Sequence, residues 1–169
     1  MKTVSIIFFF FIGAALTIAE IPNCGPLPAK RPIDCCEGLD KFIKREFYDE
    51  CDKECSPMDM CCKGNCFSMK LGILKDGAFD KETALKSLDD TFADPTWKAI
   101  YTKGLDECVA RVASMKEQLT PPPNAPKCDN VENGLIAFCL KKNLFMNCPM
   151  PSNDEECEQT RTFLNCVLP

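Results

Sequence analysis

The sequence of 169 residues contains no histidine. This absence excludes a catalytic Ser-His or Cys-His pair, a zinc site with histidine ligands and a histidine proton switch. The chain is also short of positive charge, because 25 acidic residues outnumber 20 basic ones and leave a formal net charge of −5. An acidic protein repels phosphate groups, so we expect no nucleic acid and no anionic membrane among its partners.

Long apolar runs are scarce as well, and the one candidate lies at the N-terminus. Lys2 precedes the apolar stretch 4–16, and Thr17-Ile18-Ala19 offers the small residues that a signal peptidase recognises. The stretch is shorter than the roughly 20 residues needed to span a bilayer. We therefore predict a signal peptide at 1–19, a secreted mature chain and no membrane span.

Cysteine, by contrast, is abundant, with 14 residues that all follow the predicted signal peptide. An even number in a short secreted chain predicts a disulfide framework rather than a zinc site made of thiolates. The motif Cys61-Cys62-x3-Cys66 invites comparison with the catalytic helix of phospholipase A2, but no histidine stands near it. We expect no enzymatic activity, no metal and no cofactor.

Helix signals recur along the chain, whereas no alternating strand pattern appears. Apolar residues at helical spacing predict a first helix over 36–50. Each later helix begins with a capping residue, often followed by proline or an acid. The predicted starts are Ser56-Pro57, for a helix over about 56–71, then Asp80, Asp94-Pro95, Asp129 or Asn130, and the capping box Ser152-x-x-Glu155. A turn is predicted at 75–77 and a stiff proline-rich connector at 120–126.

The cysteine spacings also carry geometric information. Residues four apart share one face of a helix, so Cys62 and Cys66 point the same way, whereas Cys61 points about 100° round the axis. Cys51 and Cys55 repeat the four-residue offset just upstream. Each of these cysteines needs a partner on another element, and spacing alone leaves the pairing open.

The order Cys36, Cys62-x3-Cys66, Cys108, Cys139-x8-Cys148 resembles the six-cysteine signature of insect odorant-binding proteins. Cys128, Pro149, Cys157 and Cys166 are similar to additions in the Plus-C subfamily, and the resemblance covers residues 24–169. The chain departs from that pattern at Cys51 and Cys55 and in the adjacent pairs Cys35-Cys36 and Cys61-Cys62.

The resemblance implies an all-α fold: a compact, disulfide-stapled bundle of about six helices around an apolar cavity, with a C-terminal extension. It divides the chain into an irregular arm at 20–35, a helical domain at 36–149 and an extension at 150–169 packed on the same domain. The implied core bridges are Cys36–Cys66, Cys62–Cys139 and Cys108–Cys148, with Cys35 as an alternative to Cys36. It leaves the pairing of Cys24, Cys35, Cys51, Cys55, Cys61, Cys128, Cys157 and Cys166 undetermined.

The function implied by the resemblance is an extracellular carrier of small hydrophobic odorant or pheromone-like molecules in sensory fluid. An olfactory receptor is a further partner, and the chain is a monomer or a homodimer. The alternative is a secreted structural or protein-interaction scaffold, inhibitor-like and without a small-molecule pocket. The predicted pocket residues, with Tyr101 as the polar one, are Phe42, Phe67, Leu88, Trp97, Tyr101, Leu105, Met115, Leu135, Phe138 and Phe145. Without histidine, we expect acid to release a ligand only below about pH 5.

Overall fold

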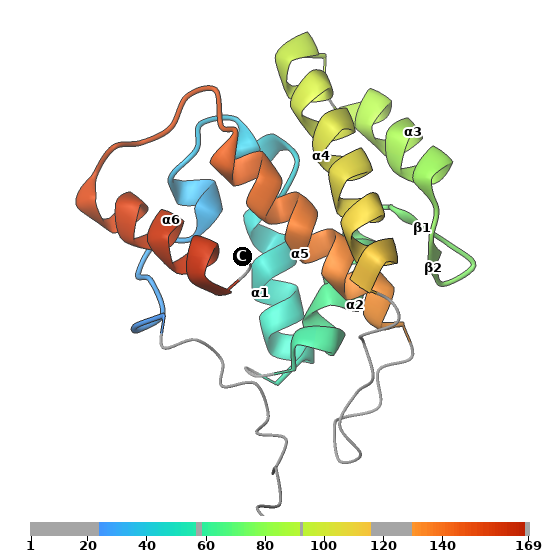
Figure 1. Ribbon diagram of the computed structural model, residues 1–169, viewed down its shortest axis with the longest axis horizontal. Coiled ribbons are helices and arrows are strands. Elements are labelled where there is room, and N and C mark those ends of the chain that lie inside the picture. The colour runs from blue at the N-terminus through green and yellow to red at the C-terminus, as the bar shows by residue number, and fades with distance from the viewer. Residues whose placement is uncertain (1–23, 57–58, 92, 116–129, 168–169) are drawn as a thin grey trace, which may run out of the picture.

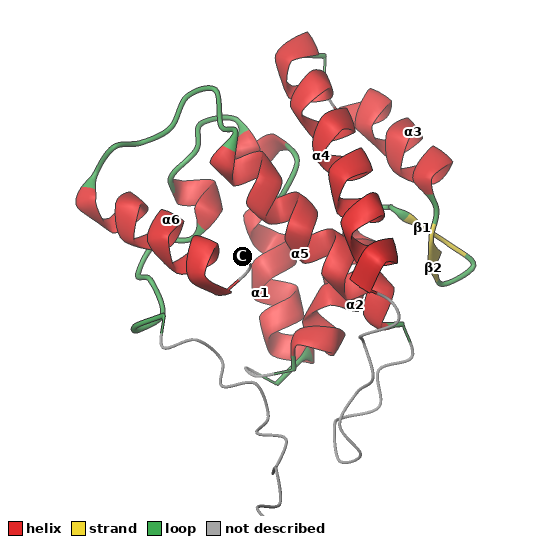
Figure 2. Ribbon diagram, viewed as in Figure 1, coloured by secondary structure: helices red, strands yellow, loops and turns green. Residues whose placement is uncertain are grey.

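The computed structural model describes residues 24–56, 59–91, 93–115 and 130–167, which form six α-helices, two 3-10 helices and one short hairpin (Figures 1 and 2). The predicted all-α class is confirmed. The predicted signal peptide and proline-rich connector lie outside the described residues. The elements are η1 (Pro32–Asp34), η2 (Leu39–Lys41), α1 (Arg45–Glu54), α2 (Met60–Lys70), β1 (Leu74–Lys75), β2 (Ala78–Phe79), α3 (Lys81–Thr91), α4 (Pro95–Met115), α5 (Val131–Met146) and α6 (Glu155–Val167).

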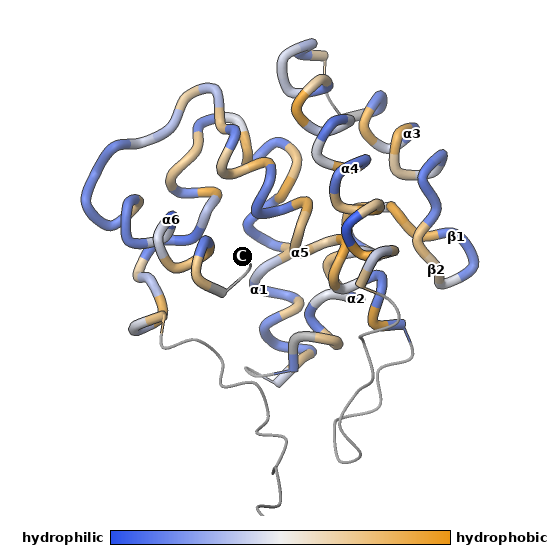
Figure 3. Tube along the Cα trace, viewed as in Figure 1, coloured by the Kyte–Doolittle hydropathy of each residue, from blue (hydrophilic) through white to orange (hydrophobic). Residues whose placement is uncertain are grey.

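Helix α5 is the centre of the fold. It packs against α2 on one side and α4 on another, while α1 packs on α2 and α3 on α4. Helix α6 lies on the far side of α5 from α3 and contacts η1 (Figure 1). Hydrophobic and hydrophilic residues alternate along the helices in Figure 3, as expected when each helix buries one side.

Three of the predicted helix starts are confirmed by side-chain caps. Asp80 accepts a hydrogen bond from the backbone N–H of Thr83 at 2.8 Å, and Asp94 accepts one from Thr96 at 2.8 Å. Asn130, one of two candidates, caps α5. These short polar side chains satisfy backbone donors that the first turn of a helix leaves without partners.

Two other predicted caps were wrong. Helix α2 begins after Asp59, which accepts from the backbone N–H of Cys62 at 2.9 Å, and not after Ser56. Helix α6 is capped by Asp154, which accepts from Cys157 at 3.0 Å, while the Ser152 hydroxyl donates to Asp154 at 2.6 Å. In both places an aspartate lies closer to the first helical residue than the serine does. The aspartate carboxylate therefore caps the helix in place of the serine.

The first predicted helix is also corrected, because 36–50 is not continuous. Gly38 has a φ of 84°, which L side chains rarely adopt, and Lys44 is extended. The chain therefore makes the single 3-10 turn η2 before α1 begins. The helical spacing correctly predicted that Phe42 and Ile43 are buried. The two residues directly follow η2 and are not part of a longer helix.

The hairpin β1–β2 was not predicted, although its turn was. Leu74 pairs with Phe79 and Lys75 with Ala78, and the two loop residues, Asp76 and Gly77, both have positive φ. An Asp-Gly loop of this conformation is typical of the tightest hairpins. Two-residue strands are too short to show an alternating pattern.

Candidate functional site

Six disulfides join described residues, and none of their cysteines is free. Cys61 is also bonded, through a bridge outside the described residues, where Cys128 lies as well. The six bridges are Cys24–Cys166, Cys35–Cys157, Cys36–Cys148, Cys51–Cys66, Cys55–Cys62 and Cys108–Cys139.

The pairing implied by the family resemblance is therefore wrong for this structure. Cys36 bonds Cys148 and not Cys66; Cys62 bonds Cys55 and not Cys139; Cys108 bonds Cys139 and not Cys148; and Cys35 bonds Cys157. The physical reason lies in the cysteines that the family pattern did not contain. Cys51 and Cys55 on α1 face Cys66 and Cys62 on α2 and take them as partners.

Helices α1 and α2 thus form a hairpin closed by two bridges. Both helices carry cysteines four residues apart, so each pair lies on one face, as the spacing predicted. The antiparallel arrangement places Cys51 opposite Cys66, with a Cα–Cα distance of 5.7 Å, and Cys55 opposite Cys62, at 5.6 Å. The two bridges fix the relative position of the helices.

A second group of bridges ties the two ends of the described chain together. Cys36 forms an isolated β-bridge with Pro151, and the backbone N–H of Ser152 donates to the carbonyl of Cys35 at 2.9 Å. The same two cysteines form the disulfides Cys35–Cys157 and Cys36–Cys148 beside this backbone contact. The N-terminal segment and α6 therefore form one layer beside α5.

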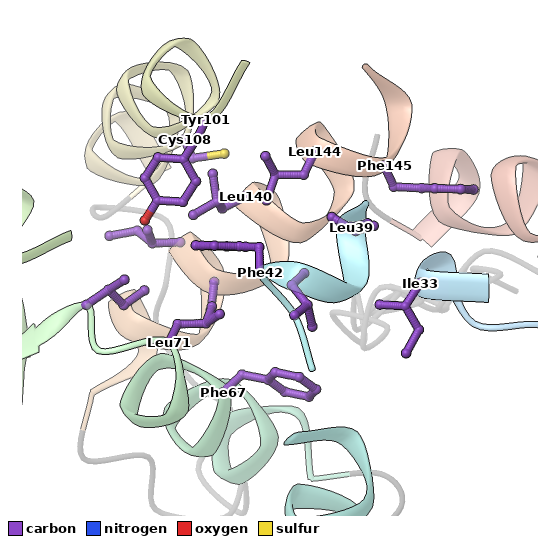
Figure 4. Close-up of a cluster of buried hydrophobic side chains, with 14 of the residues drawn as sticks. Ile33, Leu39, Phe42, Phe67, Leu71, Tyr101, Cys108, Leu140, Leu144 and Phe145 are labelled. Atoms are coloured by element: carbon purple, nitrogen blue, oxygen red, sulfur yellow. The ribbon is translucent and has the colours of Figure 1, made fainter. Parts of the chain in front are cut away.

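Most predicted pocket residues are in the buried core. Tyr101, Leu105 and Phe145 are fully buried. In Figure 4 the ring of Tyr101 extends from α4 toward Phe42 and Leu140. The core includes Phe42, Phe67, Leu88, Trp97, Tyr101, Leu105 and Phe145, whereas Met115, Leu135 and Phe138 are half-buried.

Tyr101 is the polar exception in this part of the core. Its ring packs edge-to-face on Phe42, with centroids 4.9 Å apart. Its hydroxyl is buried and has no hydrogen-bond partner, and burial raises the pKa of the phenol above its ordinary value. A buried hydroxyl without a hydrogen-bond partner lowers the free energy of unfolding by about 1–3 kcal/mol. A ligand group that forms a hydrogen bond with it removes this cost.

Trp97 lies one helical turn before Tyr101 on α4 and is also buried. Residues four apart share a helix face, so the single tryptophan faces the same side of α4 as the tyrosine. Its indole covers Gly38, where an added Cβ would lie 3.1 Å from Nε1. Glycine is required here both by its φ and by the indole.

Three pockets formed by described residues lie at the surface and not in this core. Two of them adjoin the segment 33–40, with Met150–Ser152 or Lys44–Glu46. The third, of about 520 Å³, lies between Cys24–Pro28 and α6. None of the ten predicted residues lines any of the three. A ligand beside Tyr101 would therefore occupy none of these three surface pockets.

The sequence analysis missed a cluster on the other side of α5. The Lys141 amine lies 5.2 Å from the ring centroids of Tyr48 and Phe67 and 5.0 Å from that of Phe138. The Tyr48 hydroxyl is buried and also lacks a partner. Phe67 and Phe138, which we expected in an odorant pocket, belong to this cluster. A lysine among apolar residues of a helix was the available signal.

Within the described ranges, no three metal-ligating side chains gather at one point. The described helices also include none that has the length and apolar character for a membrane span.

The comparisons with known proteins give one distant likeness. General odorant-binding protein 19a of Drosophila melanogaster is 31% identical to this chain over 86 residues, which are 51% of this chain and 52% of that protein. The chain therefore spans about half the length of the curated relative it matches. No family model and no solved structure matches the chain. At the level of distant homology, this disulfide-rich all-α protein is similar to an odorant-binding protein.

Proposed function

We propose that the protein is an extracellular, non-enzymatic carrier of small hydrophobic molecules of the odorant class. The ligand binds in the core between α4, α5 and η2, with its polar group at Tyr101. Transport through sensory fluid and delivery to an olfactory receptor are the roles that follow for a carrier of this kind.

The observation that carries the proposal is the unpartnered hydroxyl of Tyr101. It is buried among apolar side chains, where it offers one hydrogen bond and no charge. Ligand sites are mostly apolar, with a few polar groups that orient the ligand. The distant likeness to an odorant-binding protein and the disulfide framework agree with this assignment.

The test is a titration of the oxidised protein with the apolar fluorophore N-phenyl-1-naphthylamine. We expect a Kd in the micromolar range or below, about −8 kcal/mol, and displacement by volatile alcohols and ketones. If saturating probe shows no binding, the carrier function is wrong, and the alternative of a secreted interaction scaffold is favoured.

The two tyrosines provide a matched pair of variants for this test. Tyr101→Phe removes the hydroxyl in the core, and we expect it to weaken the binding of an alcohol about fivefold, since a hydrogen bond contributes about 1 kcal/mol. Tyr48→Phe makes the same chemical change in the α1–α2 hairpin and should leave binding unchanged. Equal losses in both variants would contradict the assignment to Tyr101.

Further details of the proposal rest on the sequence. They are Plus-C membership, the signal peptide at 1–19, the arm, domain and extension boundaries at 20–35, 36–149 and 150–169, and a monomeric or homodimeric state. Intact masses before and after cleavage in a secreting host, together with a native mass, test the signal peptide and the oligomeric state.

A further inference from the structure

Lys141 is a lysine whose amine faces three aromatic rings. Tyr48 comes from α1, Phe67 from α2 and Phe138 from α5 itself, one turn before Lys141. The rings of Tyr48 and Phe67 pack edge-to-face at 4.9 Å. Their positions are fixed, because the Cys51–Cys66 bridge lies one turn after Tyr48 and directly before Phe67.

The described residues give this amine no carboxylate as an ion-pair partner. Asp52, whose charge acts on Lys141, already pairs with two other cations: Arg31 at 3.6 Å and Lys63 at 2.7 Å. Arg31 also lies over the outer part of the cluster, 5.1 Å from the ring centroid of Tyr48. The ammonium form of Lys141 is therefore favoured by the rings and by the more distant charge of Asp52, without a direct ion pair.

Burial lowers the pKa of Lys141 to about 8; the charge of Asp52 opposes this shift, and those of Lys63 and Arg31 add to it. Cation–π contact favours the ammonium form, by about 0.5–2 kcal/mol, against the larger effect of desolvation. At pH 7.4 a larger share of this amine is then neutral than of an ordinary lysine. A neutral amine has the free electron pair that a nucleophile needs.

We propose that Lys141 captures small aldehydes reversibly as imines. The amine nitrogen attacks the carbonyl carbon and forms a C–N bond, giving a carbinolamine. Loss of water then breaks the former carbonyl C–O bond and leaves a C=N bond, so the step needs no oxidant or reductant. Lys141 and Phe138 are both half-buried, so the ring cluster reaches the surface of the protein. The three rings give the hydrocarbon chain of the aldehyde an apolar surface.

This site is separate from the core site at Tyr101, and its assignment does not depend on carrier function. The two readouts differ, because reductive trapping reports a covalent bond at one lysine whether or not an apolar fluorophore binds. A failure of one test leaves the other proposal standing.

The experiment treats the oxidised protein with hexanal and sodium cyanoborohydride at pH 7.4 and maps the modified peptides by tandem mass spectrometry. We expect Lys141 to be alkylated at least tenfold faster than Lys86, which is exposed on α3 and has no ion pair within the described part of the chain. The map separates Lys141 from its neighbour Lys142 and from the terminal amine.

Two matched variants and a pH series complete the test. Lys141→Arg keeps the positive charge and should abolish the main adduct, whereas Lys86→Arg should not. The Lys141 rate should rise up to about pH 8 and then level off, while the Lys86 rate continues to rise. Alkylation in proportion to exposure, or an unmodified Lys141 in a folded protein with all its bridges, would overturn the proposal.

Discussion

The two tyrosines of the chain occupy regions that differ in how they are held together. Tyr48 belongs to the α1–α2 hairpin, where two bridges link cysteines only 15 and 7 residues apart and where Arg31 and Lys141 lie over the ring. Tyr101 belongs to the α4–α5 core, which has one bridge, Cys108–Cys139, and apolar neighbours. Both hydroxyls are buried without a partner.

The comparison shows that the role of a buried hydroxyl without a hydrogen-bond partner depends on the residues and bridges around it. Around Tyr48, short disulfide loops fix the helices, so the rings stay in place beside a cation. Around Tyr101, one bridge joins α4 to α5, and the ring lies among apolar side chains. The hairpin therefore holds its side chains by two short cross-links, whereas the proposed ligand site lies in a core held mainly by apolar packing.

The largest expected effect comes from removing one bridge in each region. Cys108→Ala with Cys139→Ala opens a loop of 31 residues, whereas Cys55→Ala with Cys62→Ala opens one of 7. Chain entropy predicts losses of about 3.5 and about 2.5 kcal/mol in the free energy of unfolding. Urea unfolding monitored by circular dichroism measures both. A larger loss for the short loop would contradict the contrast between the regions.

The next effect compares two glycines at helix contacts. An added Cβ at Gly64 would overlap the backbone of Gly134, whereas at Gly104 it would meet the side chain of Asn143 at 2.5 Å. A backbone cannot move aside as a side chain can. We expect Gly64→Ala to lower the free energy of unfolding by about 2–3 kcal/mol and Gly104→Ala to lower it by less than about 1 kcal/mol. Equal urea midpoints for the two variants would show that the α2–α5 contact is not rigid.

A smaller effect concerns Lys141 and alkaline pH. Its pKa is lowered to about 8 in the folded protein, so the unfolded chain binds more protons between pH 8 and the ordinary lysine range near 10.5. Stability should therefore rise with pH across that window. Lys141→Met should raise the melting temperature at pH 7 and reduce this rise, while Lys86→Met should do neither. A Lys141→Met protein that melts earlier would show that the cation–π contacts outweigh desolvation.

The smallest effect concerns Asp154 at the start of α6. Hydrogen bonds from Ser152 and Lys30 and from the backbone of Cys157 lower the pKa of this carboxyl to about 2. Because the folded pKa lies below the ordinary value of 3.8, its stabilising contribution is complete above that value and is lost as the pH falls toward 2. Asp154→Asn should raise the midpoint of acid unfolding slightly. An unchanged midpoint would mean that α6 does not limit acid stability.

The sequence predicted local structure better than it predicted pairing. Asp80, Asp94 and Asn130 cap helices because a cap depends on neighbours within three residues. The shared face of Cys62 and Cys66 was correct for the same reason. Their predicted partners were wrong, because the family pattern lacks Cys51 and Cys55, which bond Cys66 and Cys62 in this chain.

The candidate site was predicted only in part. Tyr101 and Phe42 are brought together in the core, as expected of residues at helical spacing with apolar neighbours. Phe67 and Phe138 have the same pattern, yet they meet Lys141 on another face. Periodicity says that a residue is buried, but which helix it meets depends on the packing of α2 and α4 around α5.

The most direct test of the central claim is energy transfer from Trp97 to bound N-phenyl-1-naphthylamine. The single tryptophan is buried one turn from Tyr101, so a probe in the core lies within a few side-chain lengths of it. We predict that tryptophan excitation produces probe emission, that a volatile alcohol abolishes it, and that Tyr101→Phe weakens the competition by the alcohol. Probe binding without transfer from Trp97 would place the ligand at another site and contradict the account.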